Sequence, residues 1–539
     1  MDDPAAESPV DWREWGEPAF AAASEAGRPV LLSLSATWCE DCHEMDEETY
    51  ANPQIVANVN DGFVPVRVDV DRHPRVRDRY NMGGFPSTVF CTPDGRILTG
   101  ATALGPEGMR QVLKRVLEVW ADRGEEAGRV PRALRDGTPP AGELRPDVEG
   151  RLVGRLEESF DAEHGGWGDD PKFPLPRTVE FALKREREQA TRTLDAIRRH
   201  LFDDYDGGFF RYAAGRDWSD VAREKLLDTN AALCRTFANA YLATGEEYYR
   251  EPAARTVGYL TTTLWTGDAF AASQAPGAGD SYGSPGTREG SAPPVDDLVL
   301  ADRNAMAIDA LLTYHAYTDD ETARRFAERA LEGLSALIED GSVAHYDGGE
   351  RDVLADQART IEALTTAREV LGDEEALTTA RAVADHTIET LHDGTAFHDG
   401  PASGPGLCSR PLYPLDTTIE LADALIDLAV LADEPRYREH ARGAVSAFAA
   451  ASGRFGAEVA SYGTVASRLN DHLVVRVGTP AGSDLHRAAL RIADHEAVVV
   501  PEAPELDGVA LARVGERESG TARTPAALER QISQLFAEG

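Results

Sequence analysis

Residues 29–45 read PVLLSLSATWCEDCHEM, and this stretch decides the fold of the first part of the chain. The apolar run over 29–34 predicts a buried strand, and the residues after it predict a helix that begins close to Cys39. The free amides and the dipole of a helix N-terminus favour a thiolate, and a cysteine three positions later can resolve a mixed disulfide. The spacing therefore indicates dithiol chemistry, with Cys39 as nucleophile and Cys42 as resolving thiol.

The sequence on either side of this motif alternates between strand and helix patterns. We expect a strand over 62–71, a hairpin over 87–98 and an amphipathic helix over 106–120, in the overall order βαβαββα. This order resembles thioredoxin, which places a cis-proline beside its cysteines, and Phe85-Pro86 stands at that point of the chain. The resemblance implies that Trp38, Phe85 and Pro86 contact the substrate of the dithiol.

Three other interpretations apply to the same residues. C-x-x-C-H is also the signature of covalent haem attachment, but haem c is normally made outside the cytoplasm, and a thioredoxin-like strand order leaves no haem pocket. A zinc site on Cys39, Cys42 and His43 lacks an evident fourth ligand, so we predict neither a cofactor nor a metal ion. The third is a head without redox activity, because Glu40 and Asp41 place negative charge between the thiols and should raise their pKa.

From about residue 151 to residue 471 the pattern changes to repeated helical periodicity. Roughly a dozen segments have the length of a helix, which suggests six hairpins. Examples are 177–202, 228–245, 302–318, 356–372, 416–433 and 435–452. The segment 416–434 is apolar over too wide a surface for a surface helix, so we expect it to be an inner helix. Strands over 472–478 and 496–501 and a final helix should follow.

Four aspartates recur at the starts of alternate predicted helices: Asp228, Asp302, Asp356 and Asp416. N-capping is the default explanation for each, because Asp accepts hydrogen bonds from the free amides of the first turn. In a ring of hairpins, however, the inner helices all start on the same rim. The four acids would then converge on one pocket mouth, as carboxylates do in sugar and cation sites.

Glycine-rich turns with aromatic residues recur at 161–174, 203–212 and 345–356, where the aromatic residues can stack on a sugar or pack the rim. The segment 223–233 (REKLLDTNAAL) adds charged residues within two helical turns, and a structural salt bridge is the alternative to catalysis there. For a carbohydrate-active ring, the catalytic candidates are Glu224, Lys225 and Asp228. The expected binding residues are Trp167, Asp206, Arg211, Asn230, Asp297, Asp302 and Asp356.

The composition limits the possible partners and the compartment. Acidic residues outnumber Lys and Arg by 93 to 55, and the net charge of -38 disfavours binding to nucleic acid or anionic lipid. Acid excess with few lysines is typical of salt-adapted proteins, so we expect a salt-requiring cytoplasm and partial unfolding at low salt. The first residues, MDDPAAESPV, lack a signal-peptide pattern, and no apolar run approaches the roughly 20 residues that cross a bilayer. We therefore expect a cytoplasmic protein.

Taken together, these motifs resemble the thioredoxin-domain-containing, spermatogenesis-associated proteins, whose thioredoxin-like head is fused to a six-hairpin toroid. The head matches through CEDCHEM (39–45) and GGFPSTVFCTPDGRIL (83–98). The body matches through HGGWGDDPKFPLP (164–176), YDGGFFRYAAGRDW (205–218) and REKLLDTNAAL (223–233). The family usually has His-Trp where this chain has Glu40-Asp41, and Gln274 and Asp280 are the counterparts of its acidic run. The resemblance implies an (α/α)6 toroid similar to N-acylglucosamine epimerases and six-hairpin glycosidases.

We therefore predict a multidomain chain that combines α/β and all-α parts. Its segments are a thioredoxin-like domain (1–122), a linker (123–148), an (α/α)6 toroid (149–471) and a small C-terminal α/β segment (472–539). One hypothesis is a thiol-disulfide oxidoreductase that acts on a dithiol protein partner. A second is a carbohydrate-active toroid, epimerase or glycosidase in type, with a redox-inactive docking head. A third is a non-catalytic binding protein. The sequence does not predict the oligomeric state.

Overall fold

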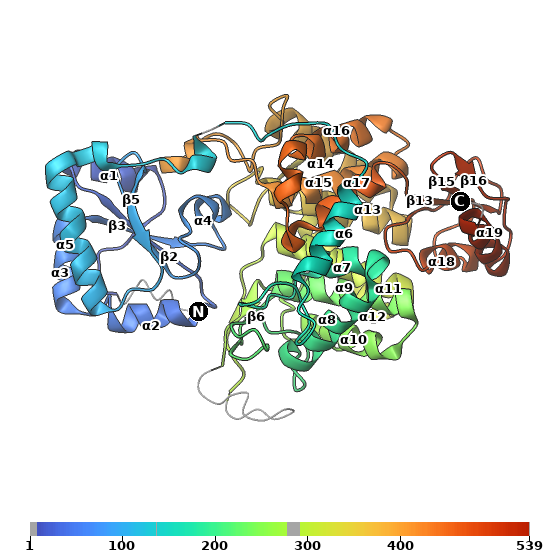
Figure 1. The fold of residues 1–539 in the computed structure, drawn as a ribbon, viewed down its shortest axis with the longest axis horizontal. Helices are drawn as coiled ribbons and strands as arrows, with labels where there is room; N and C mark the ends of the chain where they lie inside the picture. Colours follow the sequence, from blue (N-terminus) through green and yellow to red (C-terminus); the bar gives the residue numbers. More distant parts are fainter. Residues whose placement is uncertain (1–7, 136, 278–290, 538–539) are drawn as a thin grey trace. The chain divides into compact units, whose positions relative to one another are not determined.

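The computed structural model describes residues 8–135, 137–277 and 291–537, which divide into two compact units (Figure 1). The first unit contains Met1–Gly137 together with His398–Leu412. The second unit contains Thr138–Phe397 and Tyr413–Gly539. No helix in the described residues is both long enough and apolar enough to cross a bilayer.

The first unit is built on a five-stranded sheet in the order β1-β3-β2-β4-β5. Its strands are β1 (Arg13–Glu14), β2 (Val30–Ser35), β3 (Val64–Asp69), β4 (Ser87–Cys91) and β5 (Ile97–Ala101). β1 and β2 run parallel to β3, whereas β4 runs antiparallel to β2 and to β5. β2 lies at the centre and is apolar along most of its length, because both of its faces are covered. The thioredoxin-like fold predicted for the head is confirmed.

Five helices accompany this sheet: α1 (Glu17–Ala26), α2 (Glu40–Glu48), α3 (Pro53–Gly62), α4 (Pro74–Tyr80) and α5 (Pro106–Arg123). α3 and α5 pack together over a core that includes Leu31, Phe63, Phe90 and Leu113. The sequence pattern did not reveal β1, α1 or α3. β1 is only two residues long, and α1 and α3 are ten residues each, too short for a clear periodic signal.

Twelve of the α-helices that the structure describes in the second unit form six helical hairpins. They are α6 (Val148–Ser159), α7 (Pro176–Arg185), α8 (Arg187–Leu201), α9 (Leu227–Thr244), α10 (Glu247–Thr262), α11 (Ala301–Thr318), α12 (Glu321–Ser335), α13 (Leu354–Leu371), α14 (Glu374–Leu391), α15 (Leu415–Leu431), α16 (Pro435–Ser446) and α17 (Ser461–Arg468). α7, α9, α11, α13, α15 and α17 contact one another in this order, and α17 contacts α7 to close the ring. The other six helices pack outside this ring, each mainly against one inner helix, and α14 and α16 also contact a second one, α15 and α17 respectively.

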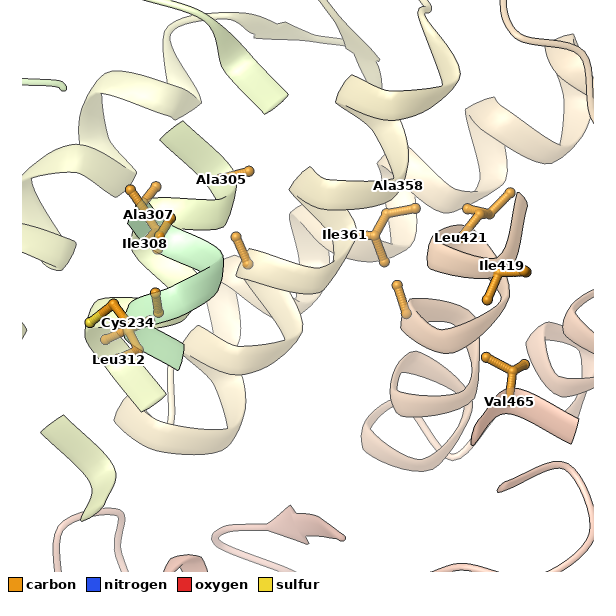
Figure 2. Close-up of a cluster of buried hydrophobic side chains, with 14 of the residues drawn as sticks. Cys234, Ala305, Ala307, Ile308, Leu312, Ala358, Ile361, Ile419, Leu421 and Val465 are labelled. Carbon is orange, nitrogen blue, oxygen red and sulfur yellow. The ribbon is translucent and has the colours of Figure 1, made fainter. Parts of the chain in front are cut away.

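The inner helices are held by small and branched apolar side chains. Figure 2 shows Ile308 and Leu312 of α11, Ile361 of α13, Leu421 of α15 and Val465 of α17, all buried in one core. The prediction that 416–434 forms an inner helix is therefore confirmed. The predicted helix over 177–202 is in fact two helices that break at Glu186, and periodicity missed the break because KREREQ contains no glycine or proline.

The C-terminal segment forms a four-stranded sheet in the order β14-β13-β15-β16. Its strands are β13 (Leu473–Val477), β14 (Val498–Val500), β15 (Ala510–Val514) and β16 (Arg517–Glu518), with α18 (Asp484–Leu490) and α19 (Pro525–Ala537) beside them. The sequence predicted β13, β14 and α19 but not β15 or β16. β14 packs against the inner helices α13 and α15, so this segment covers part of the ring.

Residues 398–412 follow α14 in the sequence but fold as part of the first unit. Asp399 accepts hydrogen bonds from Arg79 at 2.5 and 3.0 Å and from Arg75 at 3.3 Å, with all three side chains buried. Arg75 also donates to the Cys408 carbonyl and Arg79 to the Leu407 carbonyl. The chain thus returns to the head and fastens onto α4, which no pattern in the sequence predicted.

Candidate functional site

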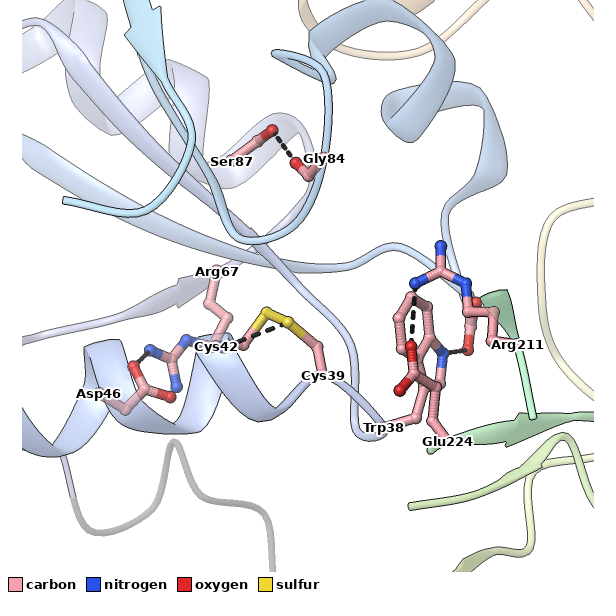
Figure 3. The surroundings of a disulfide bond; sticks show 10 residues. Trp38, Cys39, Cys42, Asp46, Arg67, Gly84, Ser87, Arg211 and Glu224 are labelled. Carbon is pink, nitrogen blue, oxygen red and sulfur yellow. Dashed lines mark hydrogen bonds and ion pairs between the residues drawn. A yellow bond between two sulfur atoms is a disulfide. The ribbon is translucent and has the colours of Figure 1, made fainter. Parts of the chain in front are cut away.

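The two cysteines of the head lie where β2 leads into α2. Cys39 is the N-cap of α2, and its Sγ accepts a hydrogen bond from the Cys42 amide at 3.2 Å. The two residues form a disulfide (Figure 3). Both residues are buried, since Cys39 is only 6% exposed and Cys42 is 3% exposed. The Cys39 sulfur thus lies against the first turn of α2.

The residues predicted to contact a dithiol substrate, which are Trp38, Phe85 and Pro86, belong to the same unit as this disulfide. The Phe85-Pro86 bond is cis, as the sequence predicted. Trp38 packs edge-on against Phe85 with 6.1 Å between ring centroids. Its indole Nε1 donates to Asp71 at 2.7 Å, and both residues are buried. Sequence reasoning missed Asp71, although it stands just two positions after the end of β3.

The predicted acids of the toroid do not cap their helices. The N-caps are Leu226, Leu300, Val353 and Pro414. Asp228, Asp302 and Asp416 are the second residues of α9, α11 and α15, whereas Asp356 is the third residue of α13. The N-capping interpretation is therefore wrong, because an apolar residue or proline occupies each cap position and the acids lie within the first helical turn.

Asp302 and Asp356 nevertheless meet at the rim. The fully buried Asp356 accepts a hydrogen bond from the backbone amide of Asp302 at 3.0 Å. Its two carboxylate oxygens lie 2.9 and 3.0 Å from Nδ1 of His345. Burial raises the pKa of Asp356, while His345 opposes that shift. One ligand atom from each of these three residues lies within 4.8 Å of the others, a spacing that a metal ion could use. The sequence had no spacing signal for His345, which lies in the turn before α13.

Two arginines extend this group across four inner helices. Arg359 of α13 pairs with Asp302 at 2.8 Å and with Glu420 of α15 at 2.9 Å. Arg303 of α11 lies 3.9 Å from Asp228 of α9. We call Asp228, Asp302, Arg303, His345, Asp356, Arg359 and Glu420 the rim cluster. The sequence thus predicted three of its members, while Asp416 is exposed.

Lys225 belongs to a structural salt bridge. It is fully buried, with Nζ 2.5 Å from Asp203 and 2.9 Å from the Gly207 carbonyl. Lys172 repeats this arrangement with Asp161, at 3.1 Å. Each lysine closes one glycine-rich turn, in which a glycine amide donates back to the aspartate carbonyl. These contacts agree with the salt-bridge alternative.

Asn230 and Trp167 also have packing roles. The side-chain amide of Asn230 accepts a hydrogen bond from the backbone amide of Phe209 and donates one to its carbonyl. Asn304 makes the same two hydrogen bonds with Phe270 one hairpin later. Trp167 is 6% exposed and donates to Gln189 at 3.1 Å. Both side chains fix the turns between hairpins.

The remaining candidates are spread over the loops of the toroid. Arg211 pairs with Glu224 at 3.2 Å, Asp206 is half-buried and Asp297 is exposed. Gln274 accepts from Tyr259 at 3.3 Å, and Asp280 lies outside the described residues. The rim cluster therefore contains only some of the binding residues that the sequence predicted.

Further along the inner helices, arginines and acids form a network inside the ring. Arg235 of α9 pairs with Glu180 of α7 at 3.1 Å, Asp309 of α11 at 2.8 Å and Glu362 of α13 at 2.6 Å. The other ion pairs are Arg177 with Glu362 and Glu420, and Arg468 with Asp423 and Asp427. The sequence analysis missed this network, although Glu420, Asp423 and Asp427 mark one face of the apolar helix α15.

Comparison with known proteins supports the thioredoxin-like description of the first unit. Residues 3–136 match a family described as "Thioredox_DsbH: Protein of unknown function, DUF255". Human spermatogenesis-associated protein 20 is 30% identical over 297 residues, which are 48% of this chain and 37% of that protein. Thiol:disulfide interchange protein DsbD 1 of Pseudomonas aeruginosa is 32% identical over 97 residues, 16% of each chain. The predicted resemblance to the spermatogenesis-associated proteins is confirmed, over well under two thirds of their length.

Among solved structures, similar chains include a cellobiose 2-epimerase from Spirochaeta thermophila. It is 19% identical, with a TM-score of 0.44, and the match covers 56% of this chain and 84% of that one. A GH76 alpha-mannanase from Bacteroides thetaiotaomicron is 12% identical, with a TM-score of 0.42 and coverage of 57% and 83%. The contacts between the helices of this chain establish its six-hairpin toroid, which the chain combines with a thioredoxin-like domain that carries a CxxC motif.

Proposed function

We propose that the first unit is a thiol-disulfide oxidoreductase that acts on a dithiol of a partner protein. The observation that carries this proposal is the Cys39–Cys42 disulfide at the N-terminus of α2. The Cys42 amide that donates to the Cys39 sulfur would stabilise a thiolate at Cys39 after reduction. The match to a thiol:disulfide interchange protein over part of the head supports the same chemistry.

The exchange would proceed in two steps. In the first, the Cys39 thiolate attacks one sulfur of a partner disulfide, which forms a mixed disulfide and releases the other partner sulfur as a thiolate. In the second, the Cys42 thiolate attacks the Cys39 sulfur, which closes the observed disulfide and releases the second partner thiolate. Two electrons pass from the head to the partner, and the reverse sequence oxidises a partner dithiol.

Trapping the mixed disulfide tests this function. Full-length protein in molar KCl should reduce insulin disulfides with dithiothreitol as electron donor, and Cys39→Ser should abolish that activity. Cys42→Ser should accumulate a mixed disulfide with insulin that non-reducing gels detect, whereas the double variant Cys39→Ser/Cys42→Ser should form none. A head that stays oxidised in dithiothreitol, or a Cys42→Ser variant that traps nothing, contradicts the proposal.

The rim cluster favours carbohydrate recognition by the toroid as a second function. Asp356 is a buried carboxylate that lies against Nδ1 of His345, and a carboxylate paired with an imidazole can take part in proton exchange with a substrate hydroxyl. Asp228, with its side chain 32% exposed, and the nearby arginines add groups that hydrogen-bond sugar hydroxyls. Epimerase or glycosidase chemistry would use this cluster, and a binding protein without catalysis would use the same contacts.

Isothermal titration with neutral mono- and disaccharides tests the second function. We expect at least one sugar to bind, and His345→Gln or Asp356→Asn to weaken its affinity about tenfold or more. Asp416→Asn, which changes an exposed acid at the start of α15, is the matched control and should bind normally. Equal affinities in all variants would remove the rim cluster from consideration.

We further infer a cytoplasmic, salt-adapted protein that does not bind nucleic acid or membranes. The net charge of -38 supports this, because acidic surfaces repel phosphates and stay hydrated in concentrated salt. The sequence-based boundaries of the toroid (149–471) and the C-terminal segment (472–539) belong to the same proposal. Cell fractionation with an antibody against the chain checks the compartment.

A further inference from the structure

A cavity of about 140 Å³ lies inside the toroid, separate from the rim cluster. Its walls come from all six inner helices, among them the C-terminal halves of α9, α11, α13 and α15 through Asn239, Tyr317, Glu369 and Asp427, and from Ala489–Val499 of the C-terminal segment. A water molecule needs about 10–15 Å³ of such space, so the cavity has room for about ten waters or one small organic molecule. None of the residues predicted from the sequence lines it.

The cavity is strongly electronegative. Eight carboxylates line it against three guanidinium groups, those of Arg177, Arg235 and Arg468. Two of the carboxylates, Asp494 and Glu496, are paired with Lys184 and Arg185, which lie outside the wall. Six carboxyl groups therefore remain against the three guanidinium groups. The negative dipole ends of the inner helices point toward the same end of the ring and add to this potential. A cation inside the cavity would therefore be stabilised.

Two side chains in the wall are incompletely satisfied by the protein. Within the described residues, no arginine or lysine side chain forms an ion pair with Glu369. The carboxylate of Glu369 accepts one hydrogen bond there, from the backbone amide of Val499. Burial, followed by the nearby charge of Asp427, raises the pKa of Glu369 to about 8. Arg468 is 5% exposed, and its Nε has no acceptor in the part of the chain that the structure describes. The wall thus offers a carboxylate that lacks a cation and a donor that lacks an acceptor.

An apolar strip completes the wall. Val370, Leu490 and Val499 line the cavity beside the charged groups. Such a surface suits carbon atoms and gives no benefit to a bare metal ion. The mixture of acids, a free donor and apolar contacts therefore fits an organic cation.

We propose that this cavity binds a small primary ammonium compound that also carries hydroxyl groups. The ammonium would lie among Glu369 and Asp427, a hydroxyl oxygen would accept from the wall, and the carbon skeleton would contact Leu490. The site is independent of the thiol chemistry of the head and of the rim cluster.

A pair of nearly isosteric probes tests this site. Serinol (2-amino-1,3-propanediol) carries an ammonium where glycerol carries a hydroxyl. Titrated into oxidised full-length protein at constant KCl, serinol should bind one per chain and about tenfold or more tightly than glycerol. Glu369→Gln should remove that preference, while Glu375→Gln, an exposed acid at the start of α14, should keep it.

Proton release provides a second measurement. Because a pKa of about 8 keeps most of the Glu369 carboxyl groups protonated at pH 7, a bound ammonium ion should displace that proton, and the apparent enthalpy should change with the ionisation enthalpy of the buffer. The charged or titratable groups near Glu369 are Asp309, Tyr317, Asp427, Arg468 and His486. Three results with the unaltered protein would overturn the proposal: serinol and glycerol bind equally, serinol does not bind, or the cavity takes up only K⁺ or Mg²⁺. These results do not depend on whether Glu369→Gln folds.

Discussion

Two buried lysines hold the glycine-rich turns of the toroid, and their energetics follow from their burial. Lys225 and Asp203 are 0% and 4% exposed, and Gly207, with φ of 79°, brings its carbonyl to the same ammonium. Removal of one partner from a buried ion pair leaves the other charge without compensation, which costs about 3–5 kcal/mol. We therefore expect Lys225→Met to lower the free energy of unfolding by about that amount.

Chemical denaturation in molar KCl measures this change. Lys114→Met is the control, because Lys114 is exposed on α5 and its loss should change stability little. If Lys225→Met is as stable as the control variant, the lysine is free for another role, and the catalytic interpretation of Lys225 regains weight.

The acids between the cysteines set the reactivity of Cys39. Glu40 and Asp41 stand in the first turn of α2, where they oppose the negative charge of a thiolate at the N-cap. The double variant Glu40→Gln/Asp41→Asn should lower the pKa of the Cys39 thiol. Since nucleophilicity falls as the thiol pKa falls, the net gain in alkylation rate at pH 7 should be about threefold.

The pH profile of iodoacetamide alkylation, followed by mass spectrometry on reduced protein, gives both quantities. Glu48→Gln, at the other end of α2, is the matched control and should leave the profile unchanged. A double variant with the alkylation profile of the unaltered protein would show that these charges are screened from the sulfur.

Glu369 gives the toroid a pH dependence of predictable sign. Its pKa lies at about 8 in the folded chain against a usual 4.5, so the folded state holds more protons than the unfolded state between these values. Stability should therefore fall as the pH rises from 4.5 to 8. Glu362 and Glu496 have pKa values lowered to about 2, so their ionisation stabilises the folded state. Their contribution is lost as the pH falls below 4.5 and does not change the stability between pH 4.5 and 8.

Glu369→Gln should flatten this decline and make the protein more stable than the unaltered chain at pH 8, by on the order of 2 kcal/mol. The two proteins should be similar at pH 5. Thermal unfolding of extensively dialysed samples across pH 5–8 measures the difference, with Glu375→Gln as the control. Parallel profiles for Glu369→Gln and the unaltered protein would show that the Glu369 carboxyl is not perturbed.

At the scale of elements, the segment 398–412 fixes α4 of the head. Asp399 is the shared anion for Arg75 and Arg79, which also donate to carbonyls of the same segment. Asp399→Asn would remove the carboxylate that these two buried guanidinium groups share. We expect a loss of about 2–4 kcal/mol in the stability of the first unit, with faster amide exchange in α4.

Hydrogen-exchange mass spectrometry localises this effect. Peptides from α4 and from 398–412 should lose protection together, while those of β13 and α19 should not change. Ser409→Ala, an exposed change in the same segment, is the control. Unchanged protection of α4 in Asp399→Asn would mean that the carbonyl contacts alone hold the segment.

The elements that sequence reasoning predicted are those with local signals. The strand before Trp38, the cysteine spacing and Phe85-Pro86 all lie within short windows, so the head could be predicted. The association of Asp399 with Arg79 joins residues 320 positions apart, and 398–412 looks like an ordinary Gly- and Pro-rich loop. Likewise, Asp356 could be assigned to the rim, but its contact with His345 depends on the shape of a turn rather than on helical periodicity.

At the scale of the whole molecule, charge is distributed in two different ways. Inside the ring, acids are matched with arginines such as Arg235 and Arg359, and burial keeps these pairs from being screened by salt. Over the whole chain, 93 acids face 55 bases. The excess is therefore mainly on the surface, where the repulsion between carboxylates depends on ionic strength.

This distribution predicts that the protein becomes more stable as salt is added. The Debye length falls from about 30 Å at 0.01 M to about 3 Å at 1 M, which removes most repulsion between surface carboxylates but little attraction within the buried pairs. We expect the melting temperature to rise between 0.1 and 2 M KCl, and partial unfolding at the lowest salt. Glu47→Gln/Glu48→Gln, which neutralises two exposed acids of α2, should reduce the slope slightly. A melting temperature that is highest in dilute buffer would contradict salt adaptation, because repulsion between the surface carboxylates would then not limit the stability of the folded protein.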